Sequence, residues 1–142
     1  GIICGTPLTM SCTYAPLTEM SDCDRLTETE LSAAVNRGEL KFMWDGEKVK
    51  LCRGVNSFVT TADGKGESDQ KIKIMDGMDM VADDSRLTAQ DSYIGKYANS
   101  YDNKCLLVTA INGYFNTLIS DKVLGSGSCK INVEEQRNFF VP

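Results

Sequence analysis

The segment 102–122 has apolar residues at every third or fourth position, and this repeat is the strongest constraint that the sequence places on its fold. The residues that form the repeat are Leu107, Ile111, Tyr114, Phe115 and Leu118. Such spacing aligns side chains along one face of an α-helix. The sequence therefore predicts a helix over 102–122, with Asp102 or Ser100 as its N-cap and a buried apolar stripe.

Two further helices are predicted from similar signals. A long helix over about 69–91 is indicated by apolar residues at helical spacing, namely Ile74, Met75, Met78, Val81 and Ala82. A shorter helix is expected to begin at Thr27, because Thr27 and Glu30 have the spacing of a capping box. It is expected to end at Gly38, since glycine readily takes the left-handed conformation that follows many helices.

A β-hairpin is the clearest strand prediction. Asp45-Gly46 separates two strand-like runs, 39–44 and 47–55, and Asp-Gly is favoured in a two-residue type I′ turn. Shorter strands are expected at 57–62 and 129–133, and a short helix within 1–13. The predicted fold class is α+β with α/β-like character: a small sheet with the hairpin 39–54 packs against the two long helices, about 69–91 and 102–122.

Length and charge narrow the class of protein. A chain of 142 residues suits a single domain, 1–142. The net charge is −5 and the basic residues are scattered, so we expect no nucleic-acid partner, which would need a positive stripe. We also expect no membrane partner, because the chain lacks an apolar run long enough for a spanning helix.

The six cysteines are widely spaced and none forms a CxxC pair. We expect reduced, mostly buried thiols, since a core of this size needs no disulfide. No metal site is expected from them, because the chain has no histidine and no close cysteine pair.

Enzymatic chemistry finds little support in the sequence. Without histidine, a Ser-His or Cys-His pair is excluded within this chain. The run 64–68, GKGES, lacks the spacing of a phosphate-binding loop and is typical of a solvated turn. We therefore expect no catalytic residue, no cofactor and no enzyme.

The acidic run 76–84 leaves an alternative open. Asp76, Asp79 and Asp83 fall on one side of the predicted helix, where three carboxylates can hold a hard cation. The alternative function is thus a small acidic ligand- or metal-binding domain that uses this helix. A solvated acidic helix face explains the same pattern.

Three segments carry a family resemblance: RGVNSF (53–58), YIGK…NSYDNK (93–104) and INVEEQR (131–137). Their order resembles the C-terminal, tube-proximal region of tail sheath proteins from contractile phages, prophages and phage-tail-like bacteriocins of Gram-positive bacteria. The resemblance covers essentially the whole chain. It implies a piece of a longer sheath protein that lacks the N-terminal part and the final C-terminal strands.

The resemblance also implies a function. Sheath subunits polymerise around an inner tube and contract to drive it through a cell envelope, without nucleotide hydrolysis. The implied partners are other sheath subunits, joined by strand exchange, together with the tail tube protein and the baseplate. The implied location is a virion tail or a phage-tail-like particle, assembled in the bacterial cytoplasm.

Two interfaces follow from this family picture as expectations. The hairpin is expected to accept a neighbour's strand along an edge formed by Leu40, Phe42, Val49 and Leu51. The polar end of the predicted helix 102–122 is expected to face the tube. The residues of this tube-facing set are Asn116, Ser120, Asp121 and Lys122.

Overall fold

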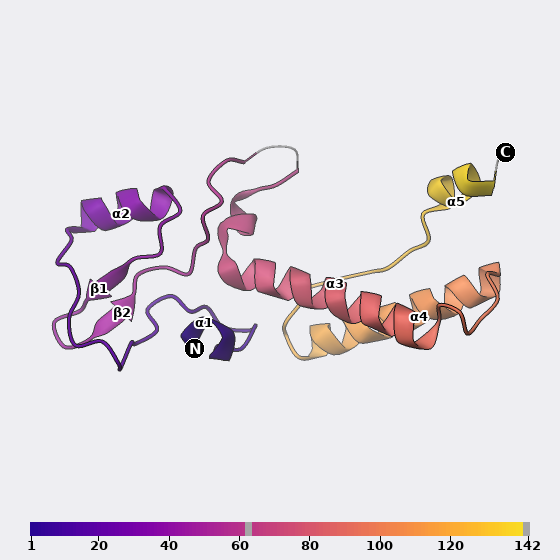
Figure 1. Ribbon diagram of the computed structural model, residues 1–142, viewed down its shortest axis with the longest axis horizontal. Helices are drawn as coiled ribbons and strands as arrows, with labels where there is room; N and C mark the ends of the chain where they lie inside the picture. The colour runs from indigo at the N-terminus through magenta and orange to yellow at the C-terminus, as the bar shows by residue number, and fades with distance from the viewer. Residues whose placement is uncertain (62–63, 141–142) are drawn as a thin grey trace. The chain divides into compact units, whose positions relative to one another are not determined.

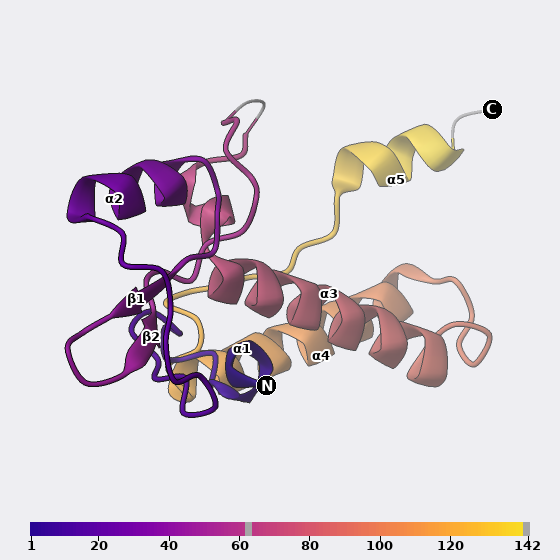
Figure 2. The same ribbon diagram turned by 60° about the vertical axis from the view of Figure 1, so that its left-hand side comes forward.

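The computed structural model describes residues 1–61 and 64–140, with side chains described up to residue 137 (Figures 1 and 2). In chain order the elements are α1 (Ile2–Gly5), α2 (Glu28–Asn36), β1 (Phe42–Trp44), β2 (Val49–Leu51), a 3₁₀ helix (Glu67–Gln70), α3 (Ile72–Ser92), α4 (Tyr101–Ser120) and α5 (Val133–Phe140). The chain divides into two compact units, 1–79 and 80–142, and the boundary falls within α3. The α+β class is confirmed, whereas the expectation of a single domain stays a prediction.

The hairpin forms with shorter strands and a different turn from those predicted. β1 and β2 pair antiparallel, with Phe42 opposite Leu51 and Trp44 opposite Val49. The Asp45 side chain accepts hydrogen bonds from the backbone N–H groups of Glu47 and Lys48, at 3.0 and 2.8 Å. The centre of the turn lies one residue further along than predicted, at Gly46 (φ +101°) and Glu47. Compared with the predicted hairpin, the pairing of β1 with β2 is shifted by two residues. Each side chain therefore stays on the face of the hairpin expected for it.

The signals at the ends of α2 are confirmed. The backbone N–H of Glu30 donates to the Thr27 hydroxyl oxygen at 3.4 Å, and the backbone N–H of Thr27 donates to the Glu30 carboxylate at 2.8 Å. Gly38, two residues beyond α2, has φ +75°. Local chemistry alone therefore fixes both ends of this helix.

Two predicted strands are absent from the described residues. Residues 57–61 form no strand, because the sheet-like pairing occurs just before them: Val55 bridges to Lys71, and residue 62 lies outside the described residues. Residues 129–133 form no strand either. There the Asn112 side chain takes the place of a partner strand, bonding both the N–H and the C=O of Cys129, at 2.7 and 3.1 Å.

Helix bounds elsewhere are close to those predicted, with one exception. The helix expected within 1–13 is reduced to the four residues of α1. The predicted helix 69–91 is observed as the 3₁₀ turn followed by α3, and Ser100 rather than Asp102 caps α4 by accepting from the N–H of Asn103 at 3.3 Å.

Each unit has its own small core. In the first unit the buried apolar residues are Cys12, Ala34, Val49, Leu51 and Val55. In the second unit the apolar stripe of α4 is half-buried at Leu107, Ile111, Tyr114 and Phe115, and buried at Leu118. The apolar residues of α3 are less covered than predicted, since none of its residues is buried and Met78 is 54% exposed.

One polar contact joins the paired helices of the second unit. The Tyr114 hydroxyl donates to the Asp84 carboxylate at 2.6 Å. Partial burial, with the Asp84 carboxylate next to it, raises the pKa of Tyr114 to about 12. The phenol is therefore a donor at any physiological pH and ties α4 to α3.

The hairpin turn predicts a pH effect on stability. The Lys50 ammonium and the backbone N–H groups of Lys48 and Glu47 hold the pKa of the Asp45 carboxyl well below its usual 3.8. A lowered pKa in the folded state stabilises the chain above the unfolded pKa, and this stabilisation is lost as pH falls below about 5. We expect Asp45→Asn, which keeps an acceptor oxygen but no charge, to unfold with a flatter acid dependence. Urea midpoints against pH, followed by Trp44 fluorescence, measure this; parallel curves would contradict it.

Candidate assembly interface

The outer edge of β2 is closed by the chain's own N-terminal segment. The N–H of Leu17 donates to the C=O of Val49 at 2.9 Å, and the N–H of Tyr14 donates to the C=O of Leu51 at 2.8 Å. The N–H of Leu51 in turn donates to the C=O of Ala15 at 3.0 Å. Segment 14–17 therefore occupies the position of a third strand, and β2 has no room for another.

The outer edge of β1 is open. In an antiparallel pair, alternate residues direct their backbone groups away from the partner strand. Lys41 and Asp45 bond across to β2, through Cys52 and Lys48, so the backbone groups of Phe42 and Trp44 point outward. Within residues 1–61 and 64–140, no hydrogen bond reaches these outward groups. An edge of this kind is a template for another strand.

A groove of about 980 Å³ borders this edge. Its lining comprises α2 and the segment before it, Met43 and Trp44 of β1, and residues 13–14 and 52–53 on the β2 side of the hairpin. α2 lies on the side of β1 away from β2 in both views (Figures 1 and 2). The apolar residues of the lining are Leu26, Leu31, Val35, Met43, Trp44 and Cys52.

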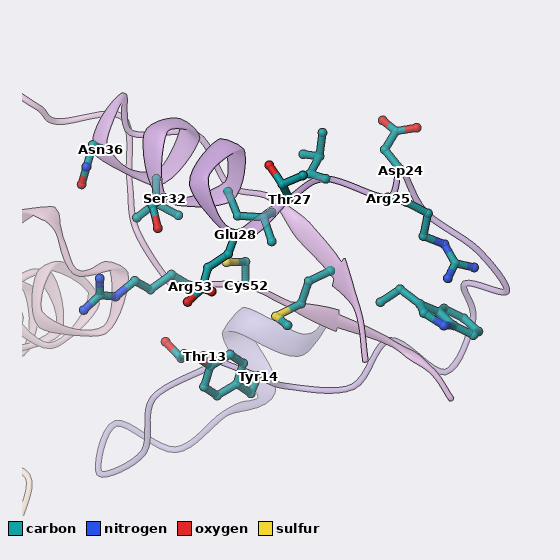
Figure 3. A pocket seen from close by; sticks show the side chains of 15 residues that line it. Thr13, Tyr14, Asp24, Arg25, Thr27, Glu28, Ser32, Asn36, Cys52 and Arg53 are labelled. Carbon is teal, nitrogen blue, oxygen red and sulfur yellow. The ribbon is translucent and has the colours of Figure 1, made fainter. Parts of the chain in front are cut away.

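Each end of the groove carries an arginine, and the two arginines differ in their partners. Figure 3 shows Arg53 at one end and Arg25 at the other, with Glu28 and Cys52 between them. The Arg25 guanidinium stacks over Trp44, 4.4 Å from the ring centroid, and pairs with Asp22 at 3.0 Å. Arg53 has no ion pair or hydrogen bond from its side chain anywhere in the described chain. The Arg25 guanidinium is therefore already paired, whereas the Arg53 guanidinium is free to bind a carboxylate.

The predicted acceptor residues separate into two groups. Leu40 and Phe42 belong to the open side of the hairpin, and Leu40 is exposed. Val49 and Leu51 are buried, and their outward backbone groups are those bonded to segment 14–17. Trp44 belongs with Phe42 on the open edge, and it was not among the residues predicted for that edge. The alternation of Phe42 and Trp44 along one strand was the available signal.

The four residues expected to face the tube are all exposed: Asn116, Ser120, Asp121 and Lys122. Lys122 takes a left-handed conformation, with φ +59°, just beyond the end of α4. The chain turns sharply there, and this leaves the polar end of α4 accessible.

The acidic run 76–84 does not converge on a common point. Asp76 pairs with Lys73 at 3.1 Å, Asp83 pairs with Arg86 at 3.1 Å, and Asp84 accepts from Tyr114. Over the residues that the structure describes, no three potential metal ligands gather together. The Asp76, Asp83 and Asp84 carboxylates therefore each have a different partner and do not share one ligand.

All six thiols are free; Cys12 is buried, Cys4 is exposed and the other four are half-buried, so the expectation of mostly buried thiols is wrong. Among the described helices, none has both the length and the apolar character needed to cross a bilayer.

An open strand edge beside a partly apolar groove is typical of proteins that associate by adding a strand to a sheet. The fold and this edge define the class: an α+β protein with an unpaired strand edge in its sheet. Comparison with known proteins gives the family. Residues 65–139 match the model of the phage tail sheath C-terminal domain. The chain belongs to the phage tail sheath family.

Individual relatives agree with this. Over 140 residues the chain is 34% identical to the tail sheath protein of Clostridium phage phiCD119, covering 98% of this chain and 39% of that protein. Its fold is similar to those of two crystallised sheath tail proteins. The protein from Desulfitobacterium hafniense has a TM-score of 0.74 at 24% identity, over 83% of this chain and 28% of that one. The protein from Listeria innocua has a TM-score of 0.74 at 20% identity, over 83% and 29%.

Proposed function

We propose that this chain is part of a structural subunit of a contractile tail sheath. The subunit polymerises around an inner tube and contracts to drive the tube through a cell envelope, without hydrolysing a nucleotide. Its partners are other sheath subunits, the tail tube protein and the baseplate. Its place is the tail of a virion, or a phage-tail-like particle such as a bacteriocin, assembled in the bacterial cytoplasm.

The observation that carries this proposal is the open edge of β1. Other sheath subunits supply an extended segment that pairs with the outward backbone groups of Phe42 and Trp44. The proposed acceptor edge therefore keeps Leu40 and Phe42 and gains Trp44, whereas Val49 and Leu51 already pair with segment 14–17. Main-chain hydrogen bonds supply affinity in such strand addition, and neighbouring pockets supply specificity.

Phe42→Pro tests the edge directly. Proline removes the outward N–H of residue 42 and leaves the ladder between β1 and β2 unchanged, because that N–H takes no part in it. Each subunit contact then loses one hydrogen bond and the close approach of the two backbones. This loss raises the critical concentration for assembly about tenfold. Phe42→Val, which keeps the N–H and favours strands, is the matched control and assembles normally.

The assay is sedimentation and electron microscopy of the complete sheath protein, with and without tubes. Thermal unfolding of each variant establishes that the hairpin survives. If folded Phe42→Pro protein assembles at the wild-type concentration, the edge of β1 does not link subunits.

The tube contact is assigned to Asn116, Ser120, Asp121 and Lys122. In the same assay, charge reversal at Asp121 and Lys122 impairs sheath formation on tubes and leaves tube-free association unchanged; normal tails would refute this assignment.

A further inference from the structure

We infer that the groove beside β1 reads the side chains of the incoming strand, and that Arg53 selects a carboxylate at one end of it. The occupant is an extended segment of a neighbouring sheath subunit, so the inference rests on the proposed function. Strand addition by itself does not discriminate between sequences, because the backbone is the same at every residue. The groove supplies the sequence preference that the edge lacks.

The apolar middle of the groove sets the first requirement. Leu31 and Val35 of α2 face the groove from one side, and Met43 and Cys52 of the hairpin from the other. Side chains of a strand point alternately to opposite faces. An incoming strand therefore directs every second side chain into the groove, and apolar side chains there are stabilised by burial. A volume of about 980 Å³ has room for several such side chains.

The two arginines set the second requirement, which is the direction in which the incoming strand lies in the groove. Arg53 is exposed and carries no side-chain partner in residues 1–61 and 64–140, so its planar guanidinium can donate to a carboxylate. Arg25 at the opposite end is held by Trp44 and Asp22. Glu28, between the ends, repels an acidic side chain placed in the middle. A strand with one acidic residue near one end thus fits in one direction only.

Synthetic peptides test this on the 142-residue chain. The probes are blocked peptides of alternating valine and threonine, about six residues long as in a usual strand. One residue near an end is glutamate, glutamine or lysine. We expect the glutamate peptide to bind about fivefold more tightly than the lysine peptide, because the ion pair at Arg53 is partly solvated. Arg53→Gln removes this preference and Arg53→Glu reverses it. Arg37→Gln, the same substitution outside the groove lining, keeps it.

The outcomes separate this inference from the proposed function. Equal binding of the three peptides to the wild-type chain would overturn side-chain reading while leaving backbone pairing intact. Absence of binding by all three would overturn it as well, and the assembly assay with Phe42→Pro would still decide whether the edge links subunits. A preference for glutamate that persists in Arg53→Gln would place the selecting cation elsewhere and would also reject the inference. Fluorescence anisotropy of labelled peptides measures all of these affinities.

Discussion

Gly38→Ala is expected to destabilise the first unit by about 2–4 kcal/mol. Gly38 has φ +75°, where an alanine side chain is strained. A methyl group there also lies 2.9 Å from the Asn56 carbonyl oxygen, the Ser57 Cα and the Val59 Cγ1. Two of these three atoms are backbone, so the collision cannot be relieved by turning a side chain. Urea unfolding followed by Trp44, the single tryptophan, measures the loss.

Gly46→Ala is the matched control for this prediction. Gly46 also has a positive φ, +101°, but a methyl group at that position meets no atom within 4 Å. Its cost is therefore the conformational strain alone, about 1–2 kcal/mol. The difference between the two variants measures the collision between Gly38 and residues 56–59. If both variants lose the same stability, segment 56–59 does not pack against the turn after α2.

Signals that act within a few residues were sufficient to predict much of this fold. The Thr27–Glu30 capping box, the left-handed Gly38 and the periodicity of α4 depend on the chain within one or two turns. They gave the ends of α2 and the bounds of α4 to within about two residues, the usual uncertainty of a helix end. The family resemblance gave the class of protein that the comparisons then established.

Features that depend on distant segments could not be read from the sequence. The pairing of Cys129 with the Asn112 side chain replaces a predicted strand, and no local pattern announces it. The closure of β2 by segment 14–17 likewise joins residues more than thirty positions apart. This closure determines which hairpin edge is free. The candidate site therefore required the structure, although the hairpin itself did not.

The groove shows the same division. No local pattern in the sequence indicates that Arg25, Trp44 and Arg53 line one groove. Folding brings them to one groove because α2 and its leading segment lie beside the hairpin. Their proposed role depends on which of their charged groups lack a partner in the folded unit, and no sequence motif shows this.

Leu118→Ala is expected to destabilise the second unit by about 2–5 kcal/mol, the usual cost of truncating a buried leucine. Leu118 is 8% exposed and is the buried residue of the described part of this unit. Its carbonyl also accepts from the N–H groups of Val123 and Leu124, where the chain leaves α4. Loss of its side chain therefore creates a cavity at the point where the chain turns back. Urea unfolding followed by far-ultraviolet circular dichroism measures the effect, since α4 contributes much of the helical signal.

Ile111→Ala and Leu106→Ala are the comparison variants for this prediction, at a half-buried and at an exposed position of the same helix. The sequence assigns Ile111 and Leu118 equal weight, but Ile111 is half-buried and lines a groove of about 400 Å³ between α3 and α4. Truncation there enlarges a space that water already enters, so it costs mainly lost apolar contact, about 1 kcal/mol. Leu106 is 53% exposed on the same helix, and its truncation changes stability by less than about 0.5 kcal/mol. A cost at Ile111 equal to that at Leu118 would mean that the α3–α4 groove is closed in solution. A cost below about 0.5 kcal/mol at Leu118 itself would mean that its side chain is not part of a packed core.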